Sequence, residues 1–416
     1  MHPTVDILRD LFIIFLLAKS AGEVMIRLHQ PPVIGELLVG MLIGAHAFGL
    51  VDVPCDGAGC PPTAEIVEVI AELGVVFLLF EVGLENRFSD LRRVGGTAGM
   101  VAASGVIVPF VAGFALLRSL GHPNAESLFM GAAMVATSVG VTARVLGDMG
   151  LLRERPSQVI LGAAVIDDVL GLLVLAVVAG TTGGDFSVWD IGVLVVEAAV
   201  FLVLAATVGT RVVRRVGPTL QRLRLSEGPF TVGIVACLGF AALAGMIGLA
   251  AIVGAFLAGM VFAEMRDHYP LERRIEPVTH FLTPFFFVFT GMQVEPGFFT
   301  DPPVLILGLA VFGLAIVTKL VPCSLAAWRL GRRNALVVGV GMAPRAEVGI
   351  IVASIGLASG TIGPEVYGVV VSMSILTTLA SPPFLRVLLR DVLEARRRES
   401  ETAEAQGGEP FGHAES

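Results

Sequence analysis

Long apolar stretches alternate with short polar connections along almost the whole chain. A helix that crosses a bilayer needs about 20 mostly apolar residues. With Gly, Pro and charged residues as boundaries, the pattern predicts thirteen membrane-spanning helices. Their approximate ranges are 5–26, 32–51, 64–85, 97–118, 125–149, 157–181, 188–210, 228–246, 248–265, 277–295, 303–327, 334–359 and 363–386. Only residues 246–249 separate the eighth and ninth, so two buried helices of soluble type are the alternative there.

The distribution of arginine tests this count independently. Odd-numbered connections and the segment after the last span carry Arg, whereas the even-numbered connections carry almost none, with Arg118 at the edge of one. Cytoplasmic connections of membrane proteins are enriched in Lys and Arg. One missed or invented span would destroy the alternation. The pattern therefore supports the count, with the N-terminus outside and the C-terminus in the cytoplasm.

Composition agrees with a membrane protein. The chain is 55% hydrophobic and 15% charged, whereas a soluble domain carries about 25% charged residues. No long polar stretch remains for a soluble domain, and no basic patch indicates nucleic acid. We therefore predict an all-α membrane protein with a transmembrane domain over residues 1–390 and a polar cytoplasmic tail over 391–416, disordered or partly helical. The first span follows Asp6, Arg9 and Asp10 without a cleavage site, which favours a retained helix over a signal peptide.

The four cysteines predict no disulfide framework. Cys55 and Cys60 share one short loop, where a disulfide, a metal site or two incidental thiols all remain open, the last being favoured. Cys237 and Cys323 lie in apolar stretches and are predicted to be small core residues. The sequence indicates no cofactor.

Two apolar segments resemble each other. Val33–Gly44 in the second predicted span matches Ile252–Ala263 in the ninth, and a weaker similarity links Phe77–Glu85 with Phe285–Gln293. The first match aligns, 219 positions apart, Gly35 with Gly254, Leu38 with Leu257, Gly40 with Gly259 and Met41 with Met260.

An odd number of spans separates the two copies, so they must cross the membrane in opposite directions. Inverted repeats of this kind are typical of secondary transporters; chance similarity between Gly-rich helices is the alternative. The repeat interpretation divides the chain into repeat one at about 1–183, a linker helix at about 188–212 and repeat two at about 228–390.

Two acidic residues stand in the middle of the sixth predicted span. Asp167 and Asp168 have about ten uncharged residues on each side, and an ionisable group at this depth is costly enough to mark a functional site. Adjacent helical residues point about 100° apart, so one carboxylate can face a cavity while the other reaches a partner helix. A helix cap is a weak alternative because the helix continues past the pair.

Lys319 in the eleventh predicted span is one of only two lysines. Arg stays charged in any protein setting, whereas a buried Lys can lose its proton, so a position that needs a detachable proton favours Lys. The alternative is a lysine that extends to the membrane surface, which is the preferred interpretation of Lys19.

Two segments, Met134–Gly150 and Gly341–Ala353, are predicted to be interrupted helices. They place these residues at mid-span: Thr137, Ser138, Gly140, Pro344, Arg345 and Glu347. Irregular backbone is tolerated in a membrane only where it is buried or lines a cavity. Its exposed carbonyl and N–H groups can bind ions. Arg345 and Glu347 either neutralise these helix ends or form a purely structural ion pair.

Three further acids are weaker candidates. Glu81 is expected to line a cytoplasmic funnel, Glu85 to be solvated near the cytoplasmic edge, and Glu36 to pair with an interfacial Arg.

Together these segments resemble the monovalent cation:proton antiporters, in the branch that holds bacterial sodium/proton and potassium/proton exchangers. The similarity spans nearly the whole chain except the tail. The matching motifs are QPPVIGELLVGMLIG from Gln30, LGVVFLLFEVGLE from Leu73, ATSVGVTARVLGDMG from Ala136, VIDDVLGLLVLA from Val165, VGAFLAGMVF from Val253 and GMAPRAEVGIIVA from Gly341.

The resemblance implies a homodimer in which a mobile core domain moves beside a dimerisation domain. It implies that Asp168 binds the transported ion, that Asp167 pairs with Lys319, and that the fifth and twelfth spans cross. The crossing would be surrounded by Thr137, Ser138 and Glu347. Two aspartates together with the lysine are similar to the electrogenic sodium exchangers, whereas potassium-efflux relatives usually differ at the first aspartate. Ala346 stands where many relatives have Gly, which affects only the predicted position of the helix break.

The predicted function is electrogenic antiport of sodium or lithium against protons in the bacterial inner membrane. Sodium and protons compete for Asp167 and Asp168, and the lipid bilayer is the surrounding medium. A potassium/proton exchanger remains open. An intramembrane aspartyl protease is a weaker alternative because it needs catalytic aspartates on different helices, and a passive channel is another.

Overall fold

The computed structural model describes residues 3–28, 30–44, 47–51, 62–181, 188–213, 215, 228–265, 271–293 and 302–405. The described residues are helical apart from short connections, and no strand is assigned among them. Cys55 and Cys60 lie outside this part of the chain. Cys237 and Cys323 are buried free thiols, as predicted.

The first half of the chain forms a series of helices. These are α1 (Pro3–Arg27), α2 (Pro32–Ile43), α3 (Pro62–Glu85), α4 (Phe88–Ser119), α5 (Asn124–Val135), α6 (Val139–Asp148), α7 (Arg155–Thr181) and α8 (Val188–Leu204), the last followed by a π-helical turn at Ala205–Gly209. The second half contains α10 (Gly228–Met246), α11 (Ala251–Ala263), α12 (Glu272–Met292), α13 (Pro302–Ala326), a short 3₁₀ turn (Trp328–Leu330), α14 (Arg332–Gly341), α15 (Ala346–Ala358) and α16 (Pro364–Ala405).

Each predicted span overlaps one of these helices or a pair of helices that follow each other. Within the described residues, five helical segments are long and apolar enough to cross a membrane by length and composition. They are Arg93–Ser119, Asn124–Asp148, Arg155–Leu175, Leu305–Ala326 and Pro364–Arg390. The short connection between the eighth and ninth predicted spans is a real boundary. Gly248 has φ +77°, which favours glycine, and ends α10.

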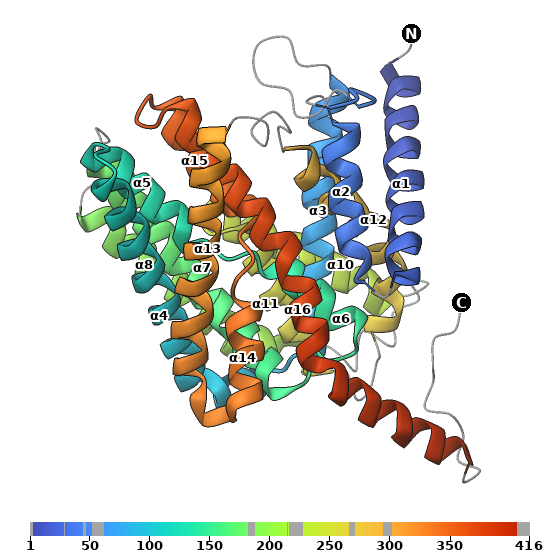
Figure 1. Cartoon of the computed structure of the whole chain (residues 1–416). Helices are drawn as coiled ribbons and strands as arrows, with labels where there is room; N and C mark the ends of the chain where they lie inside the picture. Colours follow the sequence, from blue (N-terminus) through green and yellow to red (C-terminus); the bar gives the residue numbers. More distant parts are fainter. Residues whose placement is uncertain are drawn as a thin grey trace.

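The helices pack as two groups (Figure 1). One group contains α1, α2, α3, α10, α11 and α12, and the other contains α4, α5, α7, α13, α14, α15 and α16. Helix α6 contacts both groups, through α3 and through α7 and α16. Figure 1 shows α16 crossing between the groups and its C-terminal end projecting from the rest. The helix continues to Ala405, so the first part of the predicted tail is helical.

Glycine allows close contacts inside the first group. A Cβ at Gly40 of α2 would collide with the backbone of Val288 in α12, and a Cβ at Gly259 of α11 would collide with the backbone of Phe80 in α3. Backbones that approach this closely gain packing between helices that share no other strong attraction.

Gly259→Ala is therefore expected to lower the free energy of unfolding by about 2 kcal/mol, since an extra methyl must displace packed backbone. Thermal melting in detergent measures the change. Gly99→Ala on α4 is the matched control, because a Cβ there meets nothing within 4 Å. Equal melting temperatures for the two variants would contradict the close-packing interpretation.

Candidate functional site

Helix α7 carries Asp167 into a buried contact with α13. Lys319 Nζ lies 3.2 Å from Asp167 Oδ1 and 3.4 Å from Oδ2, and the exposed side-chain fractions are 0% for the lysine and 1% for the aspartate. Removing either partner of such a buried pair leaves an uncompensated charge, which is strongly unfavourable. The pair therefore ties two helices of the second group together.

Thr137 joins this pair from the interruption between α5 and α6. Lys319 Nζ donates a hydrogen bond to Thr137 Oγ1 at 2.6 Å while it contacts both carboxylate oxygens of Asp167. An ammonium has three N–H groups and can serve several acceptors at once. The three side chains thus form one buried network.

The two interrupted helices meet beside this network. The α5–α6 interruption lies between Val135 and Val139, and the α14–α15 interruption lies between Gly341 and Ala346. Ser138 N donates to Pro344 O at 2.8 Å, and Thr142 Oγ1 donates to Gly341 O at 2.7 Å. Backbone groups that have no helical partner at one interruption are therefore hydrogen-bonded by residues at or next to the other. Buried backbone in a membrane protein requires such partners.

Arg345 is completely buried and binds carbonyl groups. Its guanidinium donates to Met134 O at 2.9 Å, Ala343 O at 3.1 Å and Ala315 O at 3.1 Å. Met134 lies in the last turn of α5, where the helix dipole is negative and a cation is stabilising. The side chain of Glu347 lies outside the described residues; its backbone belongs to the first turn of α15.

Asp168 faces a different direction from Asp167. It is partly exposed and lines a small cavity of about 10 Å³, roughly room for one water molecule. The other lining residues are apolar and come from α3, α6, α7 and α11, among them Leu79, Val139 and Phe256. The cavity therefore lies where α7 meets helices of the first group. The two carboxylates therefore point to different sides of α7, as expected for adjacent residues of a helix.

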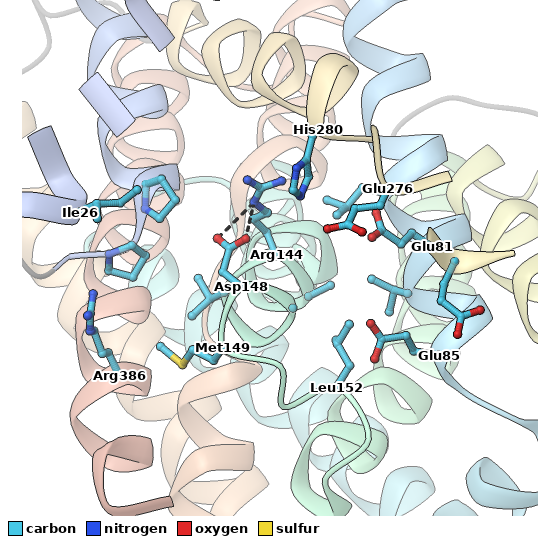
Figure 2. Close-up of a pocket in the computed structure, with 18 of the residues that line it drawn as sticks. Ile26, Glu81, Glu85, Arg144, Asp148, Met149, Leu152, Glu276, His280 and Arg386 are labelled. Carbon is cyan, nitrogen blue, oxygen red and sulfur yellow. Dashed lines mark hydrogen bonds and ion pairs between the residues drawn. The ribbon is translucent and has the colours of Figure 1, made fainter. Parts of the chain in front are cut away.

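A second, much larger cavity opens at the end of the molecule that carries the Arg-rich connections. Its volume is about 730 Å³, and Glu81 and Glu85 of α3 lie on its wall (Figure 2). Leu78 of α3 lines this cavity, and its neighbour Leu79 lines the cavity at Asp168. We call the larger cavity the funnel.

A sequence model described as "Sodium/hydrogen exchanger, transmembrane" matches residues 12–390. The chain belongs to this family. Family members are multi-pass membrane transporters, not enzymes, and membership removes the protease alternative.

Individual relatives of this sodium/hydrogen exchanger cover most of its length. The high-affinity Na⁺/H⁺ antiporter NhaS3 of Synechocystis is 35% identical, with 92% of this chain and 89% of the relative covered. The Na⁺/H⁺-K⁺ antiporter GerN of Bacillus cereus is 31% identical, with 90% and 94% covered. The sodium proton antiporter MjNhaP1 of Methanocaldococcus jannaschii superimposes with a TM-score of 0.64 at 18% identity, over 94% of this chain and 98% of that structure. The exchanger therefore has the all-helical NhaP1 antiporter fold.

Sequence reasoning missed several charged residues of the exchanger's funnel. Arg144 pairs with Asp148 one turn along α6, at 3.1 Å to Oδ1 and 3.2 Å to Oδ2, and Figure 2 shows both side chains on the funnel wall near His280. The i,i+4 spacing of two charges inside an apolar span was the available signal. Glu85 is partly exposed and lies 3.6 Å from Arg153, whose side chain is half exposed.

Glu36 is buried, and its Oε2 atom has no hydrogen-bond partner among the described residues. The expected ion pair with an arginine is not seen among those residues. The exposed Lys19 donates from Nζ to His280 O at 3.0 Å and lies over the Phe15 ring.

Proposed function

We propose that this exchanger carries out electrogenic antiport of sodium or lithium against protons, with cation and proton competing for Asp167 and Asp168. The observation that carries the proposal is the buried Asp167–Lys319 ion pair next to a second aspartate that faces a cavity. The names of NhaS3 and GerN describe sodium/proton exchange, which supports the same activity here.

The proposed cycle follows from these contacts. A sodium ion that reaches Asp168 also attracts Asp167, which weakens the contact with Lys319. Without its carboxylate partner a fully buried ammonium is strongly destabilised, so Lys319 loses its proton. Asp168 loses its own proton on binding sodium. Thr137 and Ser138 offer oxygen atoms beside the site, and Arg345 and Glu347 are assigned to support of the helix crossing.

Charge movement makes this cycle sensitive to voltage. Two protons exchanged for one sodium move one net charge across the membrane per cycle. Each such charge corresponds to about 2.3 kcal/mol per 100 mV. Membrane potential therefore drives the exchange in addition to the pH gradient.

The proposed architecture is thirteen membrane-spanning helices in two inverted repeats, with the N-terminus outside and the C-terminus in the cytoplasm of a bacterial inner membrane. Close contacts of glycine support the repeat. Gly35 of α2 packs against the backbone at Ala21 of α1, and 219 positions later Gly254 of α11 packs against the backbone at Phe240 of α10. The same offset relates Ala21 to Phe240, so both members of the contact are repeated.

A second contact supports the same relation. The pair Gly40 and Gly291 joins α2 to α12, and the pair Gly259 and Gly83 joins α11 to α3. The sequence similarities match Gly40 with Gly259 and Gly83 with Gly291. Each glycine of the first pair therefore corresponds to a glycine of the second pair. We infer that the first group is a pseudo-symmetric scaffold and that the second group moves against it as a rigid body, in a homodimer.

Purified protein in lipid vesicles tests the function. Sodium or lithium added to vesicles with an imposed pH gradient is expected to discharge the gradient, and empty vesicles are the control. Potassium-driven discharge without a sodium response would instead establish potassium/proton exchange, which the name of GerN keeps open. Discharge by none of the three cations would refute the proposal.

A further inference from the structure

A positive charge lies on the path that the funnel offers to a cation. Arg144 of α6 lines the funnel, and α6 starts next to Ser138 at the ion site. Six residues of helix correspond to about 9 Å along the axis. On the proposed function, a sodium ion that moves from the funnel to Asp168 passes this guanidinium, which always stays charged, at a distance of this order.

Nearby acids compensate that charge. The Asp148 carboxylate lies 3.1 Å from Arg144 Nε and also lines the funnel. The pair is poorly exposed, at 10% for the arginine and 28% for the aspartate side chain. Glu81 of α3 lies on the same funnel wall. The charge in direct contact with Arg144 thus comes from α6 itself.

We propose that Arg144 and Asp148 form a specificity-determining charge pair, in which Asp148 masks Arg144 and so permits cations to approach Asp168. The inference rests on the proposed exchange of sodium for protons. Neither side chain touches the transported ion, so the pair acts through the electrostatic potential of the funnel. It sets the sodium concentration at which transport is half-maximal and leaves the chemistry at Asp168 unchanged.

The expected size of the effect follows from Coulomb's law. Two unit charges about 10 Å apart at an effective dielectric constant of 20 change an equilibrium constant by more than tenfold. Water and salt in the funnel reduce this effect. We therefore expect the sodium KM of Asp148→Asn to rise about fivefold, with the maximal rate nearly unchanged.

A set of four variants in vesicles tests the pair, with exchange measured against sodium concentration. Asp148→Asn should raise KM, Arg144→Gln should lower it, and the double variant should return towards the original value. Asp148→Glu should restore a KM close to that of the unaltered protein. Adding choline chloride should reduce the shift of Asp148→Asn, because salt screens the exposed charge.

Glu23→Gln is the matched control. Glu23 and Arg27 form the same i,i+4 pair on α1, but both side chains are well exposed, and neither lines the funnel. If Arg144 and Asp148 had a purely structural role, both single variants would shift the sodium KM in the same direction, and the double variant would shift it further. That result, or an unchanged KM in Asp148→Asn, would overturn the inference.

A second readout separates this outcome from failure of the proposed function. Sodium that binds the native protein raises its melting temperature, with a midpoint that follows affinity. Unaltered protein that neither exchanges sodium nor is stabilised by it would refute the proposed function. Unaltered protein that does both, with the midpoint of Asp148→Asn unmoved, would refute only the role of the charge pair.

Discussion

Asp168→Asn is expected to abolish sodium-dependent discharge of a pH gradient in vesicles. The substitution keeps the size of the side chain but removes both the charge that holds sodium and the group that carries the competing proton. Loss of one partner from a buried charge interaction costs about 3–5 kcal/mol, so the rate should fall by at least about 100-fold. Among the described residues, the lining of the cavity beside Leu79 and Phe256 offers no other carboxylate to replace it.

The control for this prediction is Asp10→Asn. Asp10 is another aspartate in an apolar helix, buried and paired with Arg9 at 2.8 Å, far in the sequence from the proposed ion site. Its neutralisation should leave sodium KM unchanged. Asp168→Asn protein that melts normally yet exchanges sodium at the original rate would remove Asp168 from the mechanism.

The sequence was sufficient for features that depend on one helix at a time. Apolar stretches and Arg spacing predicted where the helices lie, and Thr137, Pro344 and their neighbours predicted the two interruptions. Asp167 and Lys319 were singled out because charge is costly in a membrane. Their contact across α7 and α13 rested on the family resemblance, because nothing in one helix specifies its partner.

Features that depend on the neighbours of a residue were not predictable. Arg345 was expected to neutralise helix ends or pair with Glu347, and its contact with Met134 O at the end of α5 agrees with the first alternative. The sequence did not specify its other carbonyl partners, in α13 and in the α14–α15 interruption. The funnel position of Arg144 and the buried site of Glu36 likewise follow from how α2, α3, α6 and α12 pack together. The repeated Gly contacts show the same limit. Sequence similarity indicated which helices correspond to each other, but only the packed structure showed that their Gly contacts correspond as well.

Lys319→Gln is expected to convert the exchanger from voltage-driven to voltage-insensitive transport. The variant keeps hydrogen-bonding capacity for Thr137 but has no proton to release, so one proton should leave per sodium bound. The net charge moved per cycle then falls from one to zero, and the contribution of about 2.3 kcal/mol per 100 mV disappears. An imposed potential of that size alters the sodium gradient at equilibrium by nearly 50-fold in the unaltered protein.

The measurement is sodium accumulation in vesicles held at a fixed pH gradient, with the membrane potential set by potassium and valinomycin. Lys19→Gln is the matched control because it removes the other lysine, whose Nζ binds His280 O at an exposed position, and its voltage dependence should stay intact. Because Lys319→Gln leaves Asp167 buried without a cation, Asp167→Asn combined with Lys319→Gln provides a variant without that isolated charge. Full voltage dependence in the single and the double variant would show that the second proton is carried elsewhere, since the double variant keeps no ionisable side chain in the network of Asp167, Lys319 and Thr137.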